Sequence, residues 1–438
     1  MTIKKSLAMQ DRARNRIPGM TQLLSKRPDM FAPGAWPAYY HKAEGVEVWD
    51  LDENKYIDMS IGGIGANILG YSDPDVDRAV IDAIKKGSSS SLNCAEEVEL
   101  ADLLCELHPW ADMVRYARSG GEAMAIAVRI ARAHTGKDKI AFCGYHGWHD
   151  WYLAANLNTG TELNDHHITG LEPKGVPKGL THTAFPFRYN HPEELRSIVE
   201  VHRKNLAAIV MEPIRSEEPA PGFLEEIRDI ADETSAVLII DEISAGFRLN
   251  PGGAHLKFEM VPDIAVFSKS IGNGYPMAAI IGKQDVMQSA QNTFISSTMW
   301  TERIGPVAAI ATIRKFMEKD VHKHLKAIGS AVQAGWKEQA KKHGIQITIG
   351  GIAPLGHFTF DHPEALSIKA YFVQLMLERG FLASNLFYAM YAHNLIHVEQ
   401  YLSSVGESFE IVAKAISDES LDERINHRPA SSGFKRLA

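Results

Sequence analysis

The sequence predicts an α/β fold: a mostly parallel central sheet with helices on both faces, followed by a smaller α+β domain. Between residues 70 and 315, short apolar runs alternate with amphipathic helical stretches. Continuously apolar runs are typical of strands covered on both faces, and their alternation with helices favours parallel strands joined by crossover helices. After residue 316 the alternation stops and a long helical stretch follows, which indicates a second, smaller unit.

The predicted strands are apolar, rich in β-branched residues and short, so they suit the interior of a sheet. They are VRYA at 114–117, KIAFC at 139–143, AAIVME at 207–212, AVLIID at 236–241, IAVFS at 264–268 and AAIIG at 278–282. Helices are expected at 96–107 and 121–136. Ser119 is a candidate N-cap of the second helix and Gly136 is a candidate C-terminal stop, since these residue types favour the two ends of helices.

Three regions follow from this pattern. Residues 1–70 form an N-terminal segment with a helix and a hairpin at 44–59, expected to pack at the domain boundary. Residues 71–315 form the major domain, and residues 316–438 form the small α+β domain. The small domain is expected to contain a helix at 316–343, strands at 345–351 and 356–360, and a helix at 363–379. The polar tail at 426–438 is expected to be mobile.

Composition and charge argue against several classes of protein. The chain has 438 residues, a formal net charge of -8 and a pI near 6.2. It therefore lacks the basic excess with which nucleic-acid-binding proteins neutralise phosphates. Its apolar runs are too short to span a bilayer, and its N-terminus lacks the apolar stretch of a secretory signal. The three cysteines show no metal-binding spacing. We expect a cytoplasmic protein that binds neither nucleic acid nor membrane.

A glycine-containing turn, RSGGEA, follows the first predicted strand and precedes a helix. Gly120 and Gly121 let backbone N–H groups approach an anion, and the helix N-terminus adds a favourable dipole. The hydroxyl of Ser119 is a further candidate donor to a phosphate. The alternative is an ordinary turn with a helix cap, and the turn by itself does not decide between the two.

Aromatic residues follow the second predicted strand, in the segment GYHGWHDW at 144–151. Tyr145 is placed to lay its ring against a flat heteroaromatic ligand. The alternative is a loop that packs its aromatic side chains into the core. His146 and His149 are three residues apart, but no third ligand is identifiable, so we expect no metal site.

An acidic and a basic residue each end an apolar strand. Asp241 is costly in such a place unless a positive group meets it, and a protonated pyridine nitrogen would be such a partner. Lys269 precedes a glycine-containing loop, where partial burial lowers proton affinity and suits an amine that forms a Schiff base. The alternatives are a helix-capping aspartate and a solvated lysine. Further along, Thr298 follows Ser297 in a loop and either reaches a phosphate or caps a helix.

Taken together and in order, six segments resemble the class III aminotransferases, in particular the branch around glutamate-1-semialdehyde aminomutase. They read Ser119-Gly120-Gly121-Glu122-Ala123, Tyr145-His146-Gly147, Glu212-Pro213, Asp241-Glu242-Ile243 with Gly246-Phe247-Arg248, then Lys269 and Thr298. The resemblance extends from about Ile17 to the last helices. Six elements in the family's order are far more specific than any one of them.

The resemblance implies a fold type I enzyme that uses pyridoxal phosphate (PLP), with 71–315 as the PLP-binding domain, acting as a homodimer with a shared active site. It assigns the Schiff base to Lys269 and the ring nitrogen to Asp241, which are the catalytic residues. It places Tyr145 and Ile243 on the two ring faces, and Thr298 on the neighbouring subunit's phosphate. The residues assigned to the cofactor are Ser119, Gly120, Gly121, Tyr145, His146, Glu212, Asp241, Ile243, Lys269 and Thr298.

Substrate-facing positions differ from the semialdehyde aminomutase. Ile214-Arg215-Ser216-Glu217 stands where the family often has an asparagine, and Tyr388 stands where it has a glutamate. We therefore expect an aminotransferase that moves an amino group from a small amine donor to a carbonyl acceptor. The alternatives are an intramolecular aminomutase, another PLP reaction, and a non-catalytic relative that binds a phosphate ligand.

Overall fold

The computed structural model describes residues 2–166, 168–425 and 428–433. The chain divides into two compact units, one of Pro74–His322 and one that joins Met1–Asp73 to Lys323–Ala438. The sequence-based boundaries lay at 70/71 and 315/316, and the N-terminal segment now shares a unit with the C-terminal region. Of the predicted mobile tail, residues 426–427 and 434–438 lie outside the described residues.

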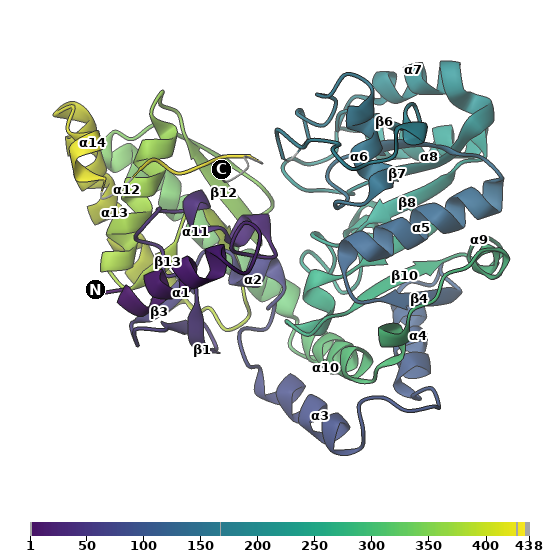
Figure 1. Cartoon of the computed structure of the whole chain (residues 1–438), viewed down its shortest axis with the longest axis horizontal. Coiled ribbons are helices and arrows are strands. Elements are labelled where there is room, and N and C mark those ends of the chain that lie inside the picture. Colours follow the sequence, from purple (N-terminus) through teal and green to yellow (C-terminus); the bar gives the residue numbers. More distant parts are fainter. Residues whose placement is uncertain (1, 167, 426–427, 434–438) are drawn as a thin grey trace. The chain divides into compact units, whose positions relative to one another are not determined.

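The unit Pro74–His322 is built around a seven-stranded sheet with the order β4-β10-β9-β8-β7-β5-β6 (Figure 1). Its strands are β4 (Met113–Ala117), β5 (Lys139–Cys143), β6 (Ala184–Pro186), β7 (Leu206–Met211), β8 (Val237–Asp241), β9 (Ile264–Phe267) and β10 (Ala278–Gly282). Neighbours from β6 to β9 are parallel, whereas β10 is antiparallel to both of its neighbours. The six predicted strands are confirmed to within one residue, and the predicted α/β class with a mostly parallel sheet is confirmed.

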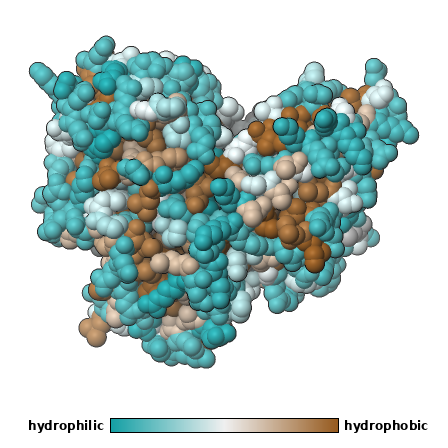
Figure 2. Space-filling model, turned by 180° about the vertical axis from the view of Figure 1, so that it is seen from behind, coloured by the Kyte–Doolittle hydropathy of each residue, from teal (hydrophilic) through white to brown (hydrophobic). Residues whose placement is uncertain are grey.

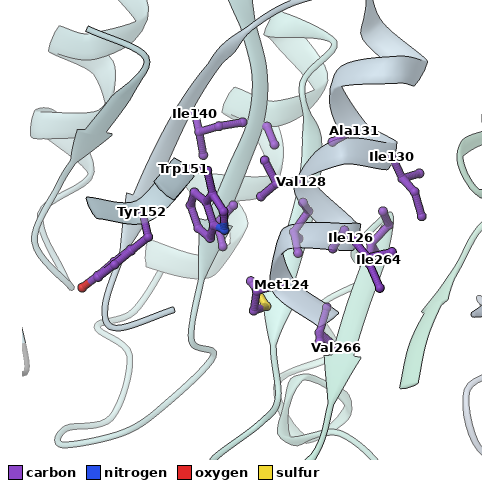
Figure 3. Packing of buried hydrophobic residues seen from close by; sticks show 14 of the residues in the cluster. Met124, Ile126, Val128, Ile130, Ala131, Ile140, Trp151, Tyr152, Ile264 and Val266 are labelled. Atoms are coloured by element: carbon purple, nitrogen blue, oxygen red, sulfur yellow. The ribbon is translucent and has the colours of Figure 1, made fainter. Parts of the chain in front are cut away.

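Side chains of these strands alternate between two apolar layers, as the pleat of a strand requires. On β7, Ala208 and Val210 join one buried cluster while Ile209 and Met211 join another. The first cluster is covered by α5 (Gly120–Thr135), whose Met124 and Val128 are buried in it together with Ile264 and Val266 of β9 (Figure 3). The second is covered by α7 and α8. Both faces of the sheet are therefore buried.

The remaining helices of this unit are α3 (Pro74–Lys85), α4 (Glu96–Leu107), α6 (Asp150–Leu153), α7 (Pro192–His202), α8 (Phe223–Thr234), α9 (Gln284–Met287) and α10 (Ile304–Glu318). The predicted stop at Gly136 is confirmed, because this residue is left-handed with φ +65°. Ser119 does occupy the N-cap of α5, but the expected side-chain bond is absent. Instead the Arg118 backbone N–H donates to Oε2 of Glu122 at 2.9 Å, so this carboxylate serves the helix start.

The other unit contains two smaller sheets. One has the order β1-β2-β3-β13 and the other β11-β12-β14. The strands are β1 (Tyr40–Glu44), β2 (Glu47–Asp50), β3 (Lys55–Met59), β11 (Ile347–Gly350), β12 (Leu355–Phe360), β13 (Phe381–Ala383) and β14 (Leu386–Tyr388). The predicted hairpin is confirmed as β2 and β3. The parallel pairing of β3 with β13 explains why the N-terminal segment belongs to this unit.

Helices complete this unit: α1 (Lys4–Arg14), α2 (Gly62–Gly65), α11 (Val321–His343), α12 (Ala365–Glu378), α13 (Leu395–Ser417) and α14 (Leu421–Arg424). The single helix predicted for 316–343 is wrong at its start. Asp320 adopts φ +49°, a left-handed conformation that no helix interior tolerates, so α10 ends before it and α11 begins after it. Within the described chain, no helix combines the length and apolar content needed to cross a bilayer.

Candidate active site

The predicted site residues other than Thr298 lie in segments at one edge of the seven-stranded sheet. Asp241 ends β8, Lys269 follows β9, and Glu212 follows β7. The turn after β4 reaches the same edge, because two successive antiparallel pairings restore the direction of β4 to that of β9. The carboxyl ends of parallel strands are where open α/β sheets bind ligands.

The side chain of Lys269 is fixed by a neighbouring hydroxyl. Its Nζ donates to Oγ of Ser244 at 2.7 Å. Burial, and next the positive charge of Arg215, lower the pKa of Lys269 to about 8. The residue opens the 3₁₀ turn η7 (Lys269–Gly272) with φ +37°, a strained conformation of the kind that gathers at functional sites. The result is an amine that is substantially neutral in mildly alkaline solution.

Asp241 is 3% exposed, and each of its carboxylate oxygens has a hydrogen-bond partner. Its Oδ1 accepts from the Ile243 backbone N–H at 2.9 Å, and its Oδ2 lies 2.8 Å from Nδ1 of His146. The other ring nitrogen, Nε2 of His146, lies 3.0 Å from the Cys143 carbonyl oxygen. A carbonyl oxygen can only accept, so Nε2 donates there.

The glycines after β4 sit where a Cβ would crowd a neighbouring side chain. A Cβ at Gly120 would lie 2.8 Å from Cδ1 of Ile243, and one at Gly121 would lie 3.2 Å from Nδ1 of His149. Gly147 has φ +103°, and its Cβ would lie 2.9 Å from the Cα of Gly121. The first N–H groups of α5 have no partner within the helix. The turn therefore leaves backbone donors and the positive end of a dipole open to an anion.

The remaining predicted residues have different environments. Tyr145 is partly buried and packs its ring edge-on against Tyr152, with centroids 5.7 Å apart. Burial raises the pKa of Tyr145, and the charge of Arg215 opposes that effect. Ser119 and Thr298 are exposed, and Thr298 opens the short turn η9 (Thr298–Thr301). No group of three or more potential metal ligands occurs among the described residues.

Glu212 and Arg215 form an ion pair beside a cavity. Nη1 of Arg215 lies 2.9 and 3.0 Å from the two carboxylate oxygens of Glu212. The pair lines a cavity of about 340 Å³ at the ends of β5 and β7. Its walls are Cys143, Gly144, Asp165, His166, Arg188, Tyr189, His191, Glu212, Arg215, Ser216 and Glu217. Sequence reasoning noted Arg215 only as a departure from the family pattern, and the pairing itself depends on how the loop after β7 folds.

A second polar network lies behind the site. Glu242 is 1% exposed, and its Oε1 lies 2.7 Å from Nδ1 of His255 and accepts from the His255 backbone N–H at 2.8 Å. Nε1 of Trp110 donates to Nε2 of His255 at 3.0 Å. Nε of the buried Arg248 donates to the carbonyl oxygen of Ser244 at 2.8 Å. This network supports the turn that carries both Asp241 and Ser244, and sequence reasoning missed its histidine and tryptophan.

Comparison with known proteins gives a consistent result. The family model described as aminotransferase class III matches residues 30–396. A 3-aminobutyryl-CoA aminotransferase of Cloacimonas acidaminovorans is 32% identical over 431 residues, covering 95% of this chain and 98% of the relative. A glutamate-1-semialdehyde 2,1-aminomutase of Dechloromonas aromatica is 34% identical over 392 residues, covering 84% of this chain and 89% of the relative. Among solved structures, the PLP-bound FumI protein of Sphingopyxis sp. MTA144 superimposes with a TM-score of 0.85 at 25% identity, covering 98% and 99% of the two chains.

Proposed function

The chain belongs to the class III aminotransferase family, and we propose that Lys269 and Asp241 are the residues that carry its amino-group transfer. The protein is a PLP-dependent aminotransferase with the fold type I architecture. The observation that supports the assignment most directly is Lys269: a partly buried amine with a lowered pKa, beside a buried carboxylate, at the edge where such sheets bind ligands.

The residues at this edge fit PLP. A flat ring with a basic nitrogen needs a buried acid, which Asp241 supplies, and a phosphate needs donors without bulk. Gly120 leaves no room for a Cβ against Ile243, so the start of α5 presents backbone N–H groups instead of side chains. We assign the phosphate to this turn, the ring nitrogen to Asp241 and one ring face to Tyr145. Ser119, His146, Glu212, Ile243 and Thr298 complete the proposed set.

PLP supplies an electrophilic carbon for a Schiff base with an amine and a conjugated ring that takes up an electron pair. Lys269 would hold the cofactor through Nζ, and its free amine would take up and return a proton. Ser244 holds Nζ through its hydroxyl while the amine is free. Asp241 would pair with the protonated ring nitrogen, and His146 orients Asp241 through its contact with Oδ2. Each step uses a group whose position is fixed by a hydrogen bond.

The second candidate function is an intramolecular aminomutase, in which one molecule is both donor and acceptor. It is supported by aminomutase relatives at 30–34% identity. The differences after the Glu212-Pro213 pair favour intermolecular transfer. A non-catalytic relative has no need of both a lysine with a lowered pKa and a buried aspartate, so it is the weakest alternative.

We also propose a cytoplasmic homodimer. Several large apolar side chains of the Pro74–His322 unit are more than half exposed, namely Leu92, Val98, Trp148, Phe294 and Met299. Figure 2 shows apolar patches between the polar side chains of one face. Contiguous exposed apolar patches are typical of surfaces that bind another chain. The exposed Thr298 lies in the same stretch of chain as Phe294 and Met299, as expected of a residue that reaches a neighbour's phosphate.

The function is tested by the visible absorption of the purified protein loaded with PLP, compared with Lys269→Ala. The wild type is expected to show a Schiff-base band that one amine donor bleaches, with release of a separate carbonyl product. Conversion of a single substrate into its isomer, without a separate donor, would favour the aminomutase. A wild type that shows no band and matches Lys269→Ala would overturn the assignment of Lys269.

A further inference from the structure

We infer that Arg215, held in place by Glu212, binds the acidic group of the substrate, so that the amine donor is an amino acid whose carboxylate lies close to the reacting amine. This inference rests on the proposed function and adds to it the chemical class of the donor and the residue that recognises it. It is carried by the cavity beside the site, by the ion pair that lines it, and by the relation of that pair to Lys269.

The cavity has the size and place of a substrate pocket. Its volume of about 340 Å³ falls within the range of roughly 300–1,000 Å³ that small-molecule sites occupy. It opens at the ends of β5 and β7, on the same edge of the sheet as Asp241 and Lys269. The cavity therefore shares Glu212 with the proposed cofactor site and lies on the same edge of the sheet.

Arg215 links the cavity to the reacting amine. It lines the cavity, and a quarter of its side chain is exposed there. After burial, its charge is the largest influence that lowers the pKa of Lys269, and it also acts on the pKa of Tyr145. A charge that affects both side chains lies close to the proposed place of the cofactor. An anion bound by Arg215 is therefore within electrostatic range of the amine at Lys269.

Glu212 gives Arg215 a fixed orientation. The carboxylate is 6% exposed and receives Nη1 through two bonds, so the guanidinium is placed before any substrate arrives. A guanidinium that is already held in one orientation loses less side-chain entropy when a substrate binds. The planar fork of arginine is well suited to a carboxylate. Gly144 has φ +107°, and a Cβ there would lie 2.8 Å from Oε2 of Glu212, so glycine is what allows this approach.

The second arginine of the cavity is a poorer candidate. Arg188 is more than half exposed and is bound to Glu194 by its backbone N–H and its guanidinium. Asp165 and Glu217 also line the cavity and are exposed. Arg215 is therefore the cation of this cavity that is best placed to hold an anionic group near the reacting amine.

The experiment compares donors that differ only in the acidic group. The pairs are 3-aminobutyrate with isopropylamine, and alanine with ethylamine. The rate at which each bleaches the PLP-loaded protein is measured for the wild type, Arg215→Met, Arg215→Lys and the surface control Arg196→Met, which removes an exposed pair with Glu226. Arg215→Met is expected to slow acid-bearing donors roughly 10- to 100-fold and their decarboxylated twins less than about threefold. Arg215→Lys should retain part of the rate.

A binding measurement accompanies the rates. Propionate, a carboxylate without an amine, is titrated into the PLP-loaded protein by calorimetry, and its affinity is expected to fall in Arg215→Met but not in Arg196→Met. Because Arg215→Met leaves Glu212 buried without its partner, the double variant Arg215→Met with Glu212→Gln is measured as well. Equal losses for both members of a donor pair, or unchanged propionate binding, would overturn the inference while leaving the aminotransferase intact. A wild type that is bleached by no amine would instead overturn the proposed function.

Discussion

Nδ1 of His146 lies 2.8 Å from Oδ2 of Asp241, and both side chains are buried, with 1% and 3% of their surface exposed. The relationship is specific because the other nitrogen of the ring already faces the Cys143 carbonyl oxygen at 3.0 Å. Asp241 is thus partnered before a cofactor binds. A buried carboxylate with a partner is stable, whereas one without a partner is strongly destabilising.

Replacing His146 with leucine is expected to destabilise the apoprotein more than the PLP-loaded protein. Loss of His146 leaves Oδ2 of Asp241 buried without a partner, while Oδ1 keeps the Ile243 backbone N–H. Breaking a buried pair in this way typically costs up to about 3–5 kcal/mol. A bound ring nitrogen would restore a partner and recover part of that loss. Denaturant unfolding with and without PLP measures the difference. As a control, His191→Leu removes an exposed pair with Glu193 and should change little. Equal losses in the two forms would contradict the proposed role of Asp241.

The lowered pKa of Lys269 predicts a pH-dependent stability of the apoprotein. Its folded pKa is about 8, below the ordinary 10.5, so the folded state binds fewer protons than the unfolded state between those values. Stability then rises with pH across this window, and the penalty is fully present below pH 8. Lys269→Met removes the titrating group and should stabilise the apoprotein at pH 7 by at most about 3 kcal/mol.

The measurement for Lys269 is the difference in unfolding free energy between Lys269→Met and the wild type at pH 7 and pH 9.5. The advantage of the variant should shrink at the higher pH. A constant difference would show that burial of the methionine, and not the charge of the lysine, is responsible. Lys139→Met, at a partly buried lysine with no such role, serves as the matched control.

Removal of the Ser244 hydroxyl tests how Lys269 is held. Ser244→Ala removes the hydroxyl that accepts a hydrogen bond of 2.7 Å from Nζ of Lys269. Losing a hydrogen bond to a charged group costs about 1.5–3 kcal/mol, so we expect slower loading of PLP and a lower kcat, with KM for the donor affected less. Ser244→Thr keeps the hydroxyl and should restore part of the loading rate. Stopped-flow absorbance of PLP uptake measures it, and an unchanged rate in Ser244→Ala would exclude this role.

Most of the sheet and half of the site could be predicted from the sequence. Strands such as Lys139–Cys143 and Ala278–Gly282 are predictable because their burial on both faces demands an unbroken apolar run. The strand Ala184–Pro186 was missed because it is three residues long and ends in proline. A charged residue at the end of an apolar strand, such as Asp241, can be recognised from the local sequence. Its burial there is costly without a partner, which indicates a functional role.

The rest of the site depends on contacts between distant segments. The bond of His146 to Asp241 joins residues 95 apart, and the bond of Trp110 to His255 joins residues 145 apart. No local pattern encodes such pairs, because they follow from the order of the strands. Arg215 and Glu212 are close in sequence, yet their loop is not helical, so the spacing alone did not predict the ion pair.

A methyl group added at Gly144 should show whether the Glu212–Arg215 pair contributes to substrate binding as well as to stability. Gly144→Ala adds a Cβ 2.8 Å from Oε2 of Glu212 and also places alanine at φ +107°, where L residues are strained. We expect a loss of roughly 1–3 kcal/mol in unfolding free energy.

Because Glu212 must move, Arg215 loses its fixed orientation. KM for acid-bearing donors should therefore rise, while KM for decarboxylated amines changes little. Gly136→Ala is the control. Gly136 is also left-handed, and a Cβ there would meet nothing within 4 Å, so this variant has backbone strain without a clash. If both variants lower stability but only Gly144→Ala raises KM, the effect lies in the contact with Glu212; a matching rise in Gly136→Ala would assign it to stability alone.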